Sequence, residues 1–175
     1  MTEFNIDYYL QAVEEATENM IFKLLGHVFA PIDINFILDK LNINVSETNL
    51  DSNAIGKITI EQSNAEIVLN KKELNICKKR FTLAHELGHW HLYHLENKTD
   101  LVTEYSNHKQ TSIKEIYANR FATSILVPRR IFKNILQSTR DIPTLAQVFQ
   151  VPENAIKYRI ISIYGQETLT TLGWS

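Results

Sequence analysis

The sequence has little cysteine and no long apolar run. Cys77 is the single cysteine among 175 residues, so no disulfide can form within the chain, which fits a reducing compartment. No stretch approaches the roughly 18 consecutive apolar residues that a membrane span needs. Residues 1–7 are acidic and lack the basic segment and apolar run of a signal peptide. We therefore expect a cytoplasmic protein that does not engage a membrane.

A strong excess of charge of either sign is also missing. The formal net charge is −2, with 44% apolar and 22% charged residues, which is ordinary for a globular protein. This balance excludes a protein that binds polyanions through bulk electrostatics. A chain of 175 residues is long enough for one domain with a small appendage.

One stretch carries the pattern of a catalytic metal site. Residues 85–89 read His-Glu-Leu-Gly-His, which matches the His-Glu-x-x-His pattern of zinc peptidases. Helix positions four apart share a face, so His85 and His89 can bind one ion. Glu86 is displaced by one position and can reach a water beside that ion, as a general base must. An amphipathic helix can carry this pattern by chance, but the small and apolar residues around the pair favour a buried site.

A second stretch offers the third ligand that a catalytic zinc site needs. The metzincin pattern requires histidine at position 95, where this sequence has leucine. Glu115 lies instead on a later predicted helix, with Asn119 four residues further along the same face. Glu115 can complete the site while Asn119 accepts the free ring N–H of a ligand histidine. Imidazole and carboxylate ligands suit zinc, and they also suit manganese and iron.

The two motifs together resemble the ImmA/IrrE family of metallo-endopeptidases. The matching residues are Thr-x-Ala-His-Glu-x-Gly-His at 82–89, Glu-x-x-Ala-Asn-x-Phe-Ala at 115–122 and Leu-Val-Pro at 126–128. The resemblance implies a zincin-like fold with His85, His89 and Glu115 as metal ligands, and Glu86 as the catalytic glutamate. It also implies a protein substrate, namely a helix-turn-helix repressor of a phage or mobile element. The sequence departs from the family at Tyr117, where many members carry a second glutamate.

Hydrophobic periodicity predicts an α+β fold. We expect helices over 5–28, 34–41, 78–93 and 112–125, and strands over 43–45, 57–60 and 66–69. The strands predict a small, mostly antiparallel sheet beside an active-site helix pair, as in a zincin-like core. Strand 66–69 is a candidate sheet edge on which substrate aligns as an added strand, with an ordinary meander strand as the alternative. The polar segment 95–112 is predicted to be a loop.

The region after residue 127 reads as a helical addition. We expect a helix over 129–136, and residues 144–160 read as helix, tight turn, helix, which resembles the helix-turn-helix of DNA-binding proteins. Residues 128–175 carry six basic and three acidic side chains, a small excess for a DNA-binding surface. We therefore predict a peptidase domain over 1–127 and a C-terminal helical region over 128–175. This region packs on the peptidase or docks a repressor, with DNA binding as the weaker alternative.

The sequence favours a zinc-dependent endopeptidase that inactivates a partner protein by cleavage. Candidates for stabilising the oxyanion formed during hydrolysis are His108, Tyr117 and Arg120. One alternative is a non-catalytic zincin-like antirepressor, or a toxin–antitoxin component, that binds its partner without cutting it. The other alternative is a DNA-binding regulator that acts through residues 144–160.

Overall fold

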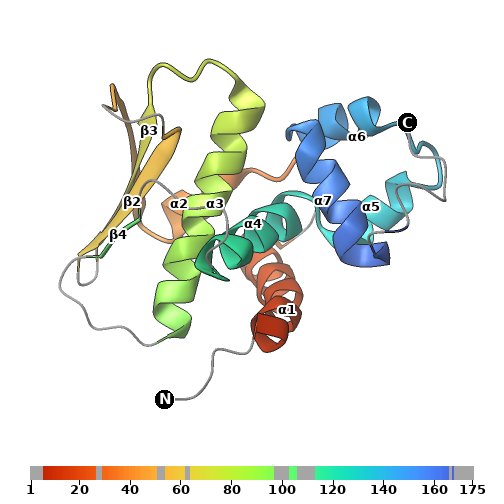
Figure 1. Ribbon diagram of the computed structural model, residues 1–175, viewed down its shortest axis with the longest axis horizontal. Helices are drawn as coiled ribbons and strands as arrows, with labels where there is room; N and C mark the ends of the chain where they lie inside the picture. The colour runs from red at the N-terminus through yellow and green to blue at the C-terminus, as the bar shows by residue number, and fades with distance from the viewer. Residues whose placement is uncertain are drawn as a thin grey trace.

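The computed structural model describes residues 6–26, 29–50, 54–61, 64–96, 103–105, 113–165 and 167. The fold is α+β, with a sheet packed against α3 on one side and helices α5 to α7 gathered on the other (Figure 1). The elements in chain order are α1 (Ile6–Leu25), α2 (Ile34–Lys40), β1 (Ile43–Thr48), β2 (Gly56–Glu61), β3 (Asn64–Asn70), α3 (Ile76–Leu95), β4 (Thr103–Tyr105), α4 (Ile113–Leu126), α5 (Arg129–Ile135), α6 (Ile142–Phe149) and α7 (Glu153–Tyr164). Within these residues, no helix combines the length and apolar character needed to cross a bilayer.

The sheet has four strands in the order β1-β3-β2-β4. β2 pairs antiparallel with both β3 and β4, while β1 pairs parallel with β3, so the pairing is mostly antiparallel as predicted. The prediction that residues 66–69 form an edge is wrong, because β3 has a partner on each side. β3 precedes α3 in the sequence, but this does not determine its place in the sheet. That place depends on the chain after β1, which crosses over so that β1 pairs with β3. The edges are β1 and β4, and β4 lies within the segment predicted to be a loop.

One face of the sheet packs against α3. Ile58 and Ile60 of β2 and Ile67 of β3 are buried, with more exposed residues between them, as expected for strands packed on one face. At the start of β2, a Cβ atom on Gly56 would lie 2.6 Å from Thr82 Cγ2 of α3. Glycine at this position therefore permits the close approach of the strand to the helix.

Helices α3 and α4 pack closely at the centre of the molecule (Figure 1). A Cβ atom on Gly88 would lie 2.9 Å from Ala118 Cα and 3.1 Å from Ala118 O, so a side chain there would force the helices apart. α3 begins at Ile76, two residues earlier than predicted, because the side chain of Asn75 caps it by accepting from the Lys78 N–H. The contact between Gly88 and Ala118 sets how near the two helices approach.

The C-terminal helices share the hydrophobic core of the rest of the chain. Phe149, Ile156 and Ile160 belong to the same buried cluster as Val13 and Phe121. The tight turn between α6 and α7 contains Gln150, which adopts a left-handed conformation with φ of 52°. Arg80 of α3 donates one hydrogen bond to the Gln150 carbonyl and another to the Ile32 carbonyl. α5 to α7 therefore pack on the core instead of extending from it.

One buried charge joins the C-terminal region to two other helices. The Arg159 side chain of α7 is 0% exposed and donates to the Val127 carbonyl at 2.7 Å and to Ser124 Oγ at 3.1 Å. It also donates through both terminal nitrogens to the carboxylate of Glu14 on α1. Burial raises the pKa of Glu14, but the hydrogen bond and charge of Arg159 outweigh burial and hold this pKa below its usual value. The arginine side of this ion pair is thus buried and makes four hydrogen bonds.

Candidate metal centre

Three side chains from α3 and α4 converge on one point. The Nε2 atoms of His85 and His89 lie 3.1 Å apart. Glu115 Oε2 lies 3.2 Å from His85 Nε2, and Glu115 Oε1 lies 3.1 Å from His89 Nε2. All three residues are buried. The structure therefore brings together the three residues that the sequence predicts as metal ligands.

The distances between these atoms suit a small divalent cation. In a tetrahedral zinc site, ligand atoms about 2.0–2.1 Å from the ion lie roughly 3.3 Å from one another. The observed separations of 3.1 and 3.2 Å are close to that value. Two imidazoles and a carboxylate also form a donor set that suits zinc, manganese and iron. His85, His89 and Glu115 can therefore hold a metal ion.

Asn119 determines which nitrogen of His85 faces the cluster. Asn119 Oδ1 lies 3.1 Å from His85 Nδ1, which is the contact expected from the sequence. An amide oxygen only accepts, so Nδ1 donates its N–H to Asn119 and Nε2 is the ring nitrogen that faces the cluster. Nε2 faces the Glu115 carboxylate at 3.2 Å, an arrangement that a cation between the two atoms would stabilise.

His89 has the protonation state of a metal ligand. Burial lowers the pKa of His89 below its usual value, although the hydrogen bond with Glu115 acts in the opposite direction. The ring is therefore neutral near pH 7, and a neutral imidazole is the form that binds metals.

Glu86 is buried beside the cluster. It follows His85 on α3 and is only 1% exposed. Burial lowers the pKa of His89 more than the charge of Glu86 raises it. Adjacent helix positions are about 100° apart, so Glu86 stands to one side of the ligand pair. A carboxylate in this position can exchange a proton with a water molecule held next to the ligands.

Two of the three candidates for the oxyanion donor, Tyr117 and Arg120, lie on other sides of α4 than Glu115. Tyr117 is buried and its hydroxyl lies 2.7 Å from His91 Nδ1. It is about 200° round α4 from Glu115, and its role as the donor stays a prediction. Arg120 lies on the side of α4 that faces α1 and α7, where it lines surface grooves. His108 lies outside the described residues.

The contact between His91 and Tyr117 is a feature that sequence analysis missed. Both residues stand two positions after a metal-ligand candidate, His89 on α3 and Glu115 on α4. Equal offsets on two packed helices are the signal from which this second contact could have been inferred.

Comparison with known families identifies the chain. The model of the Peptidase_M78 family, described as the IrrE N-terminal-like domain, matches residues 38–160. The chain belongs to this family. The match spans both metal-ligand helices and most of the α6–α7 unit, and it confirms the resemblance to ImmA/IrrE proteins and the zincin-like fold. Membership in the M78 family supports a function of the metallopeptidase or regulator type.

A solved structure gives the same fold. The M78 chain is similar to a Mycobacterium tuberculosis transcriptional regulator, with a TM-score of 0.65 and 20% sequence identity. The similarity covers 88% of this chain and 47% of the regulator, so the chain spans about half the length of that protein. At this identity the likeness shows the fold alone. No curated protein matches the chain.

Proposed function

We propose that this M78 chain is a zinc-dependent endopeptidase that inactivates a partner protein by cleavage. The observation that supports this most is the convergence of His85, His89 and Glu115 with Glu86 buried next to them. Three Lewis bases that meet in a buried place, beside a carboxylate that is not one of them, match the needs of metal-assisted peptide hydrolysis.

Each residue of the site has a distinct role in this proposal. His85, His89 and Glu115 hold the zinc ion, and Asn119 fixes the orientation of the His85 ring through the contact at Nδ1. The bound ion would polarise the peptide carbonyl and lower the pKa of a water molecule toward about 7. Glu86 accepts the proton of the attacking water and then delivers it to the leaving amine.

The proposed substrate is a helix-turn-helix transcriptional repressor. Two observations support this choice. The family to which the chain belongs is the one that its motifs resemble, and that resemblance implies repressor cleavage. In addition, the similar M. tuberculosis protein is a transcriptional regulator, which connects this fold with gene control.

The DNA-binding alternative is less well supported by the C-terminal helices. Arg159 lies on α7, the second helix of the helix-turn-helix-like pair, but its charge is buried and neutralised by Glu14. This removes one of the basic side chains on which a DNA-binding surface in this region would depend. A partner that is bound without being cut remains the rival outcome of the experiment below.

The test compares the zinc-loaded chain with Glu86→Gln on a proteome-derived peptide mixture and on purified helix-turn-helix repressors, with new termini read by mass spectrometry. We expect the native chain to generate new termini, and Glu86→Gln to bind zinc equally but generate none. Elemental analysis of both proteins controls for metal content. Equal cleavage by Glu86→Gln would exclude this residue as the base, and binding of a repressor without any cleavage would favour the antirepressor.

A further inference from the structure

A groove opens on the protein surface beside the metal centre. It has a volume of about 320 Å³ and lies between α1, α4 and α7. This volume is near the lower end of the about 300–1,000 Å³ that is usual for ligand pockets. The groove residues used below are Ile116, Asn119 and Arg120 of α4 together with Tyr158 and Ile161 of α7.

Asn119 belongs to both the groove and the metal centre. Its side chain contacts His85 at 3.1 Å, and it also lines the groove. On α4 it lies about 40° from Glu115, and Ile116 and Arg120 follow at about 100° and 140° in the same direction. The groove therefore begins where the ligand cluster ends and continues around α4 toward α7.

The walls of the groove expose apolar surface. Ile116 is 40% exposed and Tyr158 is 62% exposed, so each helix presents one large apolar or aromatic side chain to solvent. Ile161 is half-buried between them. Apolar residues that gather on two facing helices are typical of a surface that binds another chain. The chemistry of these walls suits an apolar side chain.

Arg120 is the charged residue among those that line the groove. Within the described part of the chain, its guanidinium makes no hydrogen bond or ion pair. The nearby carboxylate of Glu14 is instead engaged by Arg159. Arg120 is half-buried, and burial lowers its pKa against the opposing charge of Glu14. A partly desolvated cation of this kind favours a carboxylate on whatever enters the groove.

We propose that this groove is the specificity site of the peptidase, and that it selects a polypeptide segment with an apolar residue next to an acidic one. The proposal rests on the proposed function, because it places the substrate at the same metal centre. Arg120 stands five residues after Glu115, about 7.5 Å further along the helix axis. It also lies about 140° further round α4, so the path between the two side chains is longer than this axial rise. An extended chain at about 3.3 Å per residue needs at least three residues to cover it, and the acidic residue is therefore expected three or more positions from the bond that is cut.

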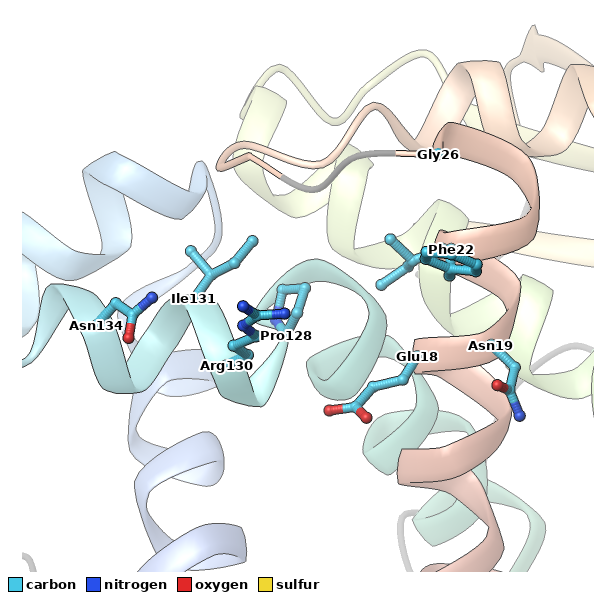
Figure 2. Close-up of a pocket in the computed structure, with 9 residues that line it drawn as sticks. Glu18, Asn19, Phe22, Gly26, Pro128, Arg130, Ile131 and Asn134 are labelled. Carbon is cyan, nitrogen blue, oxygen red and sulfur yellow. The ribbon is translucent and has the colours of Figure 1, made fainter.

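A second cleft supplies the controls. It lies between the C-terminal half of α1 and α5, and its described lining residues include none from α3 or α4. Figure 2 shows Glu18 on α1 and Arg130 on α5 reaching from opposite walls, with Phe22 and Ile131 exposing apolar surface to the same space. This cleft thus has a similar composition without contact to the ligand helices, so equivalent changes there should leave peptide selection unaltered.

The first experiment measures which peptides are cut. The zinc-loaded chain, Arg120→Gln and Tyr158→Ala are incubated with a proteome-derived peptide mixture, and cleavage sites are aligned after mass spectrometry. We expect the native chain to prefer an acidic residue near the cut. In Arg120→Gln this preference should fall about fivefold. Tyr158→Ala should weaken the preference for the apolar residue. Arg130→Gln and Phe22→Ala are the matched controls, and thermal unfolding verifies that every variant is folded.

The second experiment does not depend on cleavage. Two labelled peptides that differ only in glutamate or lysine beside the same apolar residue are titrated with zinc-loaded Glu86→Gln, and binding is followed by fluorescence anisotropy. The glutamate peptide should bind about fivefold more tightly, and the additional change Arg120→Gln should remove the difference. Equal binding of both peptides would overturn the groove proposal, even if the chain cleaves other peptides. Selective binding without any cleavage by the native chain would overturn the peptidase and retain the groove.

Discussion

Buried polar groups meet different partners on the α3–α4 pair and on the α6–α7 pair. On α7, the buried Arg159 donates hydrogen bonds to a carbonyl, a hydroxyl and a carboxylate, so donors meet acceptors. On α3 and α4, two imidazole nitrogens and a carboxylate face one another at 3.1 to 3.2 Å. Three potential ligand atoms meet there, and a cation between them would complete the arrangement.

A buried polar residue can therefore have either of two roles, one structural and one functional. A charge with complementary partners inside the fold stabilises the contact between elements, as Arg159 does between α7, α1 and α4. A group of bases that converge on one point can instead bind a cation from outside. Both kinds occur in this chain within one hydrophobic core, so burial alone does not distinguish structure from function.

The largest expected effect follows from removing a base from the converging group. His89→Ala and Glu115→Ala should each abolish stoichiometric zinc binding, because two ligands do not hold zinc as tightly as three. Elemental analysis after zinc loading and desalting measures this loss. His94→Ala is the matched control, since His94 is exposed on the same helix and contacts the Trp90 carbonyl instead of the cluster. Zinc retained by Glu115→Ala would require a different third ligand.

Removing Arg159 should instead lower stability and leave zinc binding unchanged. Arg159→Met leaves Glu14 and Ser124 without their buried donor, which should lower the free energy of unfolding by about 3 kcal/mol. Zinc stoichiometry should not change in the folded protein. Urea denaturation measures the loss, with the exposed Arg130→Met as control. A loss of zinc from folded Arg159→Met would show that the two regions are coupled and would weaken the contrast between them.

A smaller effect is expected at the residue that orients a ligand. Asn119→Ala removes the acceptor for His85 Nδ1, so zinc affinity should fall by about 10-fold to 100-fold. The free energy of unfolding of the metal-free protein should change little, because Asn119 is exposed. Competition with a zinc chelator measures the affinity, and Asn154→Ala on the exposed side of α7 is the control. Unchanged affinity would mean that the contact does not support the ligand.

The smallest effect concerns the pH dependence of the ion pair. Because the folded pKa of Glu14 is below its usual value of 4.5, the pair stabilises the fold above about pH 4.5. This stabilisation should be lost as the pH falls through the folded pKa. Urea denaturation from about pH 6 to pH 3 should show the native chain about 1 kcal/mol more stable than Glu14→Gln at the upper end only. A constant difference would assign the effect to packing and not to charge.

Local spacing predicted the two halves of the candidate metal centre, one on each helix. The positions four apart on two helices bring His85 and His89 together, and they place Asn119 next to Glu115. The strand order could not be predicted in this way, because no local sequence pattern indicates the crossover that places β3 inside the sheet. The groove and the Arg159 hydrogen bonds could not be predicted for the same reason, since each joins α1, α4 and α7 across long separations in the chain.

The missing side chain at Gly88 has a consequence for the choice of metal. Because Gly88 lies between the two histidines and meets Ala118 between Glu115 and Asn119, the distance between the helices limits the size of the ligand triangle. A triangle with sides of 3.1 to 3.2 Å surrounds an ion at the about 2.0–2.1 Å typical of zinc. Calcium prefers six to eight oxygen ligands, so a set with two imidazole nitrogens does not suit it. Glycine at position 88 thus allows the two helices to approach closely enough for the three ligand atoms to converge.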